Sequence, residues 1–158
     1  MSDHLDIPKD GVFGDVPLRD LSISLTFAYR QTPVQVWRAL TEEIGVWWTE
    51  KVHPEARTVL PPQPGASWVQ LWSNGGAFLG TVTHVHAPLL LRINGPLAMT
   101  TPVNNTVEFQ LELMDSGSTR LRLTHIALGM LHGTDQESYT QVWKDLFETA
   151  LTAYLDRR

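Results

Sequence analysis

Three histidines are the side chains whose type and spacing could do chemistry near neutral pH. His84 and His86 stand two residues apart in a predicted strand, so they share one face, and His125 ends a separate alternating run. An imidazole that reaches a cavity can hydrogen-bond a ligand carbonyl or act as general acid or base, since its ordinary pKa is about 6.5. His125 and His84 are therefore the candidate catalytic residues.

Each histidine also has a purely structural interpretation. In the run 81–86 the odd and the even positions look equally suited to the interior, so alternation leaves the facing of His84 and His86 open. His125 is in phase with Leu121 and Leu123, which predicts that it points inward. A buried histidine commonly bonds an internal partner instead of a ligand. Three imidazoles without a supporting carboxylate are a poor ligand set, so we expect no metal site.

Large aromatic side chains are the second chemical feature of the chain. It has six tryptophans in 158 residues, and we predict that some of these rings line a cavity, although ordinary core packing is the alternative. Two apolar, glycine-flanked loops, 95–99 and 128–133, carry methionines that could cover the entrance, because methionine adapts to varied shapes. The predicted ligand-binding residues are Trp47, Trp48, Trp72, His84, Met99, Phe109, Leu111, His125, Met130, Trp143 and Phe147.

Composition and missing motifs exclude several classes of function. The chain has no cysteine, which rules out disulfides, thiolate zinc sites and cysteine nucleophiles. It has no serine-nucleophile, zinc-protease or phosphate-binding motif, and we expect no cofactor. The net charge is −5 and the basic residues are scattered, which argues against nucleic-acid binding. Without a signal-peptide pattern or an apolar run of about 18 residues, we expect a cytoplasmic protein with no membrane span.

The periodicity of the chain predicts the elements that must position these residues. Thr32 before Pro33 is typical of a helix start, with threonine as N-cap and proline as the first helical residue. Four prolines in 54–64 leave room for at most a short edge strand there. We predict strands at 21–27, 57–60, 65–72, 77–86, 89–94, 106–114 and 119–126, short helices at 33–40 and 41–48, and one long amphipathic helix at 133–158.

This order of elements predicts an α+β fold. A run of strands followed by a helix favours an antiparallel sheet packed on that helix over alternating parallel units. We expect an N-terminal arm at 1–18 and a single domain at 19–158, in which a curved sheet of about six or seven strands wraps around the C-terminal helix. The two short helices after the first strand would close one end.

Three stretches of the chain carry a family resemblance. They are Thr32–Thr41 with Val46-Trp47-Trp48, then Pro64-Gly65 with Gly80-x-Val82, and finally Thr119–His125 with Tyr139, Trp143, Leu146, Leu151, Tyr154 and Leu155. In this order they resemble the SRPBCC superfamily, also called START-like or birch-pollen-allergen-like, and the most similar branch is the C-terminal domain of the heat-shock-protein-90 ATPase activator homologue. The resemblance implies a helix-grip fold with a cavity between sheet and helix, in which family members bind or transform lipids, polyketides, sterols and other small apolar molecules.

The sequence therefore predicts a carrier or sensor for a small hydrophobic molecule, with His125 orienting the ligand. Two alternatives stay open: a cyclase- or hydratase-type enzyme on an apolar or polyketide-like substrate, with a cavity histidine as acid or base, and a protein-interaction module similar to a chaperone cofactor. An open cavity beside a perturbed histidine would favour the enzyme, and a filled cavity the interaction module. A homodimer is compatible with the sequence.

Overall fold

The computed structural model describes residues 16–157, so all of the predicted arm except 16–18 lies outside the described residues. The strands are β1 (Leu18–Tyr29), β2 (Arg57–Val59), β3 (Ser67–Trp72), β4 (Gly75–His86), β5 (Leu90–Gly95), β6 (Val103–Leu113) and β7 (Thr119–Met130). The helical segments are α1 (Pro33–Leu40), α2 (Ile44–Trp47), α3 (Asp135–Lys144), η1 (Asp145–Ala150) and α4 (Leu151–Asp156).

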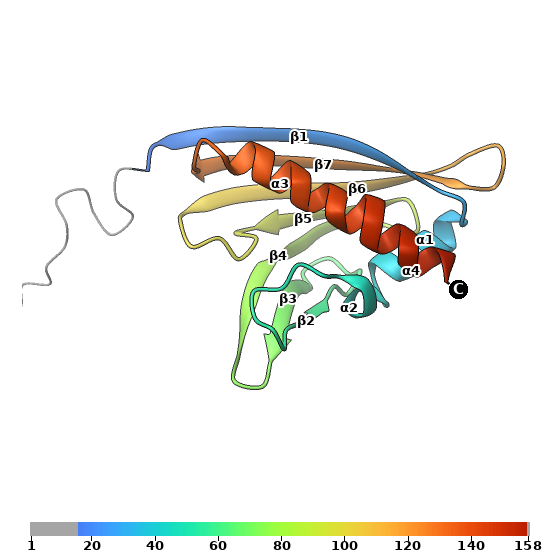
Figure 1. Cartoon of the computed structure of the whole chain (residues 1–158), viewed down its shortest axis with the longest axis horizontal. Helices are drawn as coiled ribbons and strands as arrows, with labels where there is room; N and C mark the ends of the chain where they lie inside the picture. The colour runs from blue at the N-terminus through green and yellow to red at the C-terminus, as the bar shows by residue number, and fades with distance from the viewer. Residues whose placement is uncertain (1–15, 158) are drawn as a thin grey trace, which may run out of the picture.

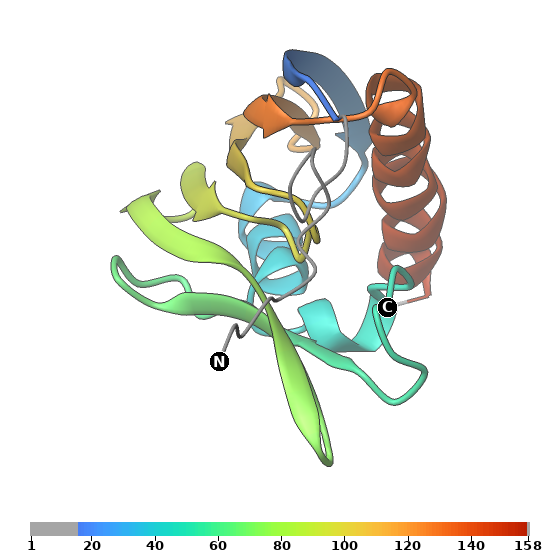
Figure 2. The ribbon, with the colours of Figure 1, turned by 90° about the vertical axis from the view of Figure 1, so that its left-hand side faces the viewer.

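All seven strands form one antiparallel sheet in the order β1-β7-β6-β5-β4-β3-β2. The C-terminal helix crosses one face of this sheet, and α1 and α2 follow the first strand, so the predicted α+β architecture is confirmed (Figure 1). Seen from the side, the sheet curves from β1 and β7 toward β3 and β2 around the face that carries the helix (Figure 2). None of the helices in residues 16–157 combines the length and the apolar character that crossing a membrane requires.

Helix α1 begins as its sequence predicts. The side chain of Thr32 accepts a hydrogen bond from the backbone N–H of Gln35, and the Gln35 side chain accepts one from the backbone N–H of Thr32. This capping box satisfies two amide groups that a helix start would otherwise leave unpaired. Trp37 on this helix is buried in the core, as expected of an anchor.

The C-terminal helix differs from the uninterrupted α-helix that we predicted. Its middle turn, η1, is π-helical, with the amide of Leu151 donating to the carbonyl of Leu146. Beside this turn the hydroxyl of Tyr29 on β1 donates to the carbonyl of Phe147, and this contact is buried. A π-turn inserts one residue, which periodicity alone does not reveal.

Strands β6 and β7 extend beyond their predicted ends. The sequence predicts residues 103–104 and 128–130 in loops, but Val103 pairs with Gly129, and Leu18 pairs with Met130 from the other side. Each end is therefore held by partners far away in the sequence, which the local pattern does not contain. As a result only residues 96–102 form the loop between β5 and β6.

Candidate ligand-binding pocket

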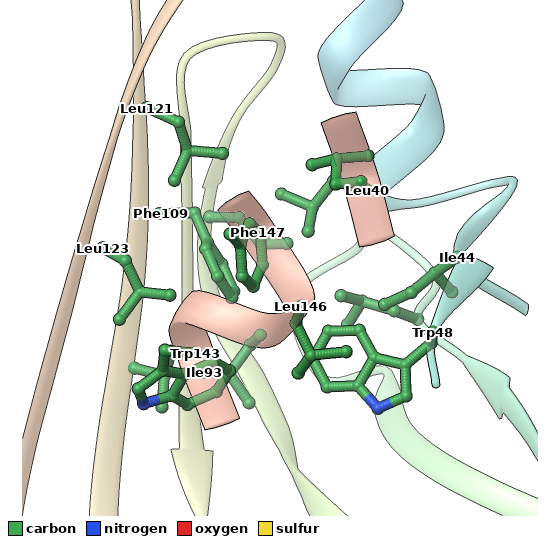
Figure 3. Close-up of a cluster of buried hydrophobic side chains, with 14 of the residues drawn as sticks. Leu40, Ile44, Trp48, Ile93, Phe109, Leu121, Leu123, Trp143, Leu146 and Phe147 are labelled. Carbon is green, nitrogen blue, oxygen red and sulfur yellow. The ribbon is translucent and has the colours of Figure 1, made fainter. Parts of the chain in front are cut away.

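Aromatic rings fill the space between the helix and the centre of the sheet. Phe147 from η1 lies with its ring centroid 5.4 Å from that of Phe109 on β6 and 5.6 Å from that of Trp47. Figure 3 shows Phe109 and Phe147 against one another between the strands and the helix. Both side chains have no exposed surface, and Leu111 is also buried. Four residues of the predicted ligand-binding set are therefore core residues: Trp47, Phe109, Leu111 and Phe147. The sequence predicted that they line an open cavity, and they do not.

A pocket remains at one end of this aromatic core. It has a volume of about 350 Å³ and lies between α3, strands β3 and β4, the segment 48–52 and the β5–β6 loop. This volume is within the range of about 300–1,000 Å³ that is typical of small-molecule sites. Another hollow, of about 400 Å³ between α2 and β2, has a smaller apolar share in its lining. The apolar walls of the helix–sheet pocket include Trp48, Trp68, Leu79, Leu97, Val142 and Trp143.

Gln70 is a buried polar residue of the pocket wall, and its amide is already engaged. The Gln70 Nε2 group donates to the carbonyl of Glu50 at 2.7 Å and to Thr58 Oγ1 at 3.2 Å. Its Oε1 atom accepts from the amide of Val52 at 2.9 Å. These bonds fix the segment 50–52 against the sheet, so Gln70 builds the wall rather than offering a free group to a ligand.

Tyr139 lines the pocket and has a raised pKa. Burial raises the pKa of Tyr139 to about 12, with further contributions from the nearby carboxylates of Asp135 and Glu50. The phenol is therefore neutral at physiological pH. Its ring also meets that of His125 edge to face, with centroids 5.5 Å apart, and His125 itself is not among the lining residues of the pocket.

His125 lies behind the pocket lining with both ring nitrogens bound. Its Nδ1 accepts the indole N–H of Trp143 at 3.1 Å, which requires that Nδ1 carry no proton. Its Nε2 therefore carries the proton and donates it to Asn105 Oδ1 at 2.8 Å. His125 has no exposed surface, and burial lowers its pKa to about 4. It is a neutral structural link, and no nitrogen is left for a ligand or a proton transfer.

The hydrogen-bond chain continues from His125 into the β5–β6 loop. Asn105 Nδ2 donates to the carbonyl of Gly95 at 3.1 Å and lies 3.6 Å from the sulfur of Met99. Met99 thus packs behind the loop, and the neighbours Leu97 and Ala98 line the pocket in its place. The loop that the sequence suggested as a cover does border the pocket, but through other residues than its methionine.

The remaining predicted residues lie elsewhere. His84 and His86 are exposed on β4, where the register shifts between Val82 and His84, and this irregularity explains why alternation could not predict their facing. Trp72 stacks on His53 with centroids 4.9 Å apart and is not part of the pocket wall.

Met130 belongs to β7, where its carbonyl accepts a hydrogen bond from Thr101, and it too is absent from the pocket wall. In residues 16–157 no three side chains of the metal-binding types come together.

Of the predicted ligand-binding set, the structure brings Trp48 and Trp143 together in the pocket. The sequence reasoning missed Trp68, Tyr139 and Val142. Trp68 has the same strand parity as the predicted Trp72, and its place near the middle of the predicted strand 65–72 is the signal that could have identified it. Tyr139 and Val142 belong to the apolar stripe of the helix. The spacing of that stripe predicts which face of the helix is buried, but not which part of that face borders a pocket.

No protein-family model matches the chain, and a search of curated proteins finds no relative. Solved structures share the fold. A Mesorhizobium loti protein, MLL2253, is 22% identical, covers 86% of this chain with 97% of its own length, and has a TM-score of 0.64. An uncharacterized protein from Rhizobium leguminosarum is 13% identical over 90% of this chain and 98% of its own, with a TM-score of 0.70.

DynU16, a protein in the dynemicin biosynthetic locus, is 18% identical over 85% of this chain and 47% of its own, with a TM-score of 0.63. These similarities establish a helix-grip-like antiparallel fold. At such identities they carry no function by themselves.

Proposed function

We propose that this protein is a carrier or sensor that binds a small, uncharged, apolar molecule in the pocket between α3 and strands β3 and β4. The observation that carries the proposal is the pocket itself, with about 350 Å³ of space and a mainly apolar lining. Burial of apolar surface provides the binding free energy, at about 25 cal/mol for each Å² removed from water. We place this activity in the cytoplasm, as the sequence predicts.

Two independent similarities agree with this proposal. The sequence motifs resemble the SRPBCC superfamily, whose members hold apolar molecules between sheet and helix. One of the proteins with a similar fold comes from a biosynthetic locus. We extend the superfamily's ligand class to this chain on the strength of the pocket lining, not of the fold alone.

The enzymatic alternative depended on a histidine in the cavity. His125 uses both nitrogens in internal hydrogen bonds, and His84 is exposed outside the pocket, so neither histidine supports general acid–base chemistry there. The interaction-module alternative was tied to a completely filled interior, and the pocket beside Trp48 and Val142 argues against it. Binding is therefore the function that the pocket supports best.

A pocket-filling substitution tests the proposal. Val142→Trp places a large ring into the pocket from α3, whereas Val34→Trp adds the same ring at an exposed position of α1. The neutral fluorescent probe N-phenyl-1-naphthylamine would be titrated into the native protein and both variants. We expect Val142→Trp to weaken binding by about tenfold or more, which corresponds to about 1.4 kcal/mol, and Val34→Trp to leave it unchanged. Equal affinities for all three proteins, or no binding by the native protein, would overturn the proposal.

A further inference from the structure

The lining of the pocket includes one charged side chain, and its charge is negative. Glu50 lies among apolar and uncharged polar residues, and no lysine, arginine or histidine is among the lining residues. None of the ion pairs between residues 16–157 involves Glu50. Glu50 is exposed, so it stands where the pocket meets solvent, and Lys51 beside it in the sequence does not line the pocket.

The start of α3, which borders the pocket through Ser138 and Tyr139, carries charges of the same sign. Asp135 and Glu137 lie in its first turn. Their carboxylates oppose the partial positive charge that the start of a helix would otherwise present to an anion. Burial raises the pKa of Tyr139, and the charges of Asp135 and Glu50 raise it further, so both carboxylates act on the pocket wall. The potential at this wall is therefore negative.

We infer that Glu50 determines the charge selectivity of the pocket, which excludes ionised carboxylic acids and admits neutral ketones, esters and hydrocarbons of the same shape. The inference rests on the proposed function and names the residue that restricts its ligand class. An acid would leave water without a cation to pair with it, and it would lie near the negative charge of Glu50. A neutral compound avoids both costs and still gains from burial against the apolar walls.

Three naphthalene compounds of similar size test the inference, because they differ chiefly in charge. At pH 7, 2-naphthoate is negative, 2-acetylnaphthalene is neutral and 2-naphthylmethylammonium is positive. Dissociation constants would be measured by NMR titration for the native protein, for Glu50→Gln and for the control Glu55→Gln. The control removes the same charge from an exposed position that does not line the pocket.

The native protein should bind the neutral ketone more tightly than the acid. We expect Glu50→Gln to strengthen binding of the acid by about 2- to 5-fold, the range for a charge interaction at an exposed side chain. The same substitution should weaken binding of the ammonium compound by a similar factor and leave binding of the ketone unchanged. Glu55→Gln should change none of the three affinities to this extent.

Salt provides a second readout that needs no variant. The Debye length falls from about 30 Å at 0.01 M salt to about 3 Å at 1 M, so added salt screens the charge of Glu50. In the native protein the affinity for the acid should therefore rise with salt relative to that for the ketone, and the affinity for the ammonium compound should fall. The ratio to the ketone removes the general effect of salt on apolar binding.

Two results would refute the inference and leave the proposed function intact, provided that the ketone binds. One is an affinity for the acid that Glu50→Gln leaves unchanged, or that Glu50→Gln and Glu55→Gln raise alike, since the second case would assign the exclusion to the net charge of the protein. The other is a ratio of affinities that does not change with salt. Failure of the ketone itself to bind the native protein would count against the proposed function.

Discussion

Acidification should destabilise the fold through His125, and the size of the effect follows from its burial. In the folded protein the pKa of His125 is lowered from its ordinary value of 6.5 to about 4. Between these values the unfolded chain binds a proton that the folded protein does not. Stability therefore falls as the pH falls through this window. The gap corresponds to a loss of about 3 kcal/mol by pH 4, while nothing is lost above pH 7.

The contribution of His125 can be isolated with a variant that lacks the titrating group. His125→Gln retains an amide that can bond Asn105, but it does not titrate. Urea unfolding of both proteins at intervals from pH 7.5 to pH 4 yields two curves of unfolding free energy. Effects of the shared carboxylates cancel in their difference, since both proteins contain them. The native protein should be the more stable at pH 7.5, and its advantage should shrink by up to about 3 kcal/mol on the way to pH 4.

Parallel pH profiles for the two proteins would refute this reasoning. They would mean that His125 titrates alike in the folded and the unfolded chain, and hence that its ring is neither neutral nor enclosed as described. A growing advantage of the native protein toward low pH would be a stronger contradiction. It would indicate a charged imidazole with an acidic partner.

Two further predictions concern the backbone at the end of β5 and in the β5–β6 loop. Ala98 has a φ angle of +59°, a conformation that costs a non-glycine residue about 1 kcal/mol, so Ala98→Gly should raise the urea-unfolding free energy by about 0.5–1 kcal/mol. The matched change Ala28→Gly in β1 should lower it by a similar amount, and a loss in both proteins would contradict the argument. A Cβ at Gly95 would clash with the backbone of Gly80, so Gly95→Ala should cost about 2 kcal/mol or more. The matched change Gly133→Ala meets no atom closer than 3.8 Å and should be nearly neutral. Equal effects of the two substitutions would count against the close approach of Gly95 to Gly80.

Local patterns predicted most of the fold because they act within a few residues. The N-cap at Thr32 and the alternation of β6 are set by neighbouring side chains, and both features are present. The features that differed depend on partners distant in the sequence. The extension of β7 to Met130 needs β1 and β6 on either side, and the π-helical turn at Phe147 lies against Tyr29 of the first strand.

The binding site was harder to predict because parity gives the face of a residue but not its depth. Phe109 and Trp68 both point to the concave side of the sheet, yet the first lies under aromatic rings and the second borders the pocket. His125 was correctly expected to point inward, but whether its nitrogens are free depends on Asn105 and Trp143. Such pairings appear only when strands and helix are placed together.

The central claim is that an apolar molecule occupies the pocket between helix and sheet, and nuclear Overhauser contacts test it most directly. With 2-acetylnaphthalene bound to the isotope-labelled native protein, ring protons should show contacts to the methyl groups of Leu79 and Val142, which face the pocket from β4 and α3. Contacts only to exposed apolar residues such as Ile126 and Leu128, or none to the pocket walls, would contradict the account.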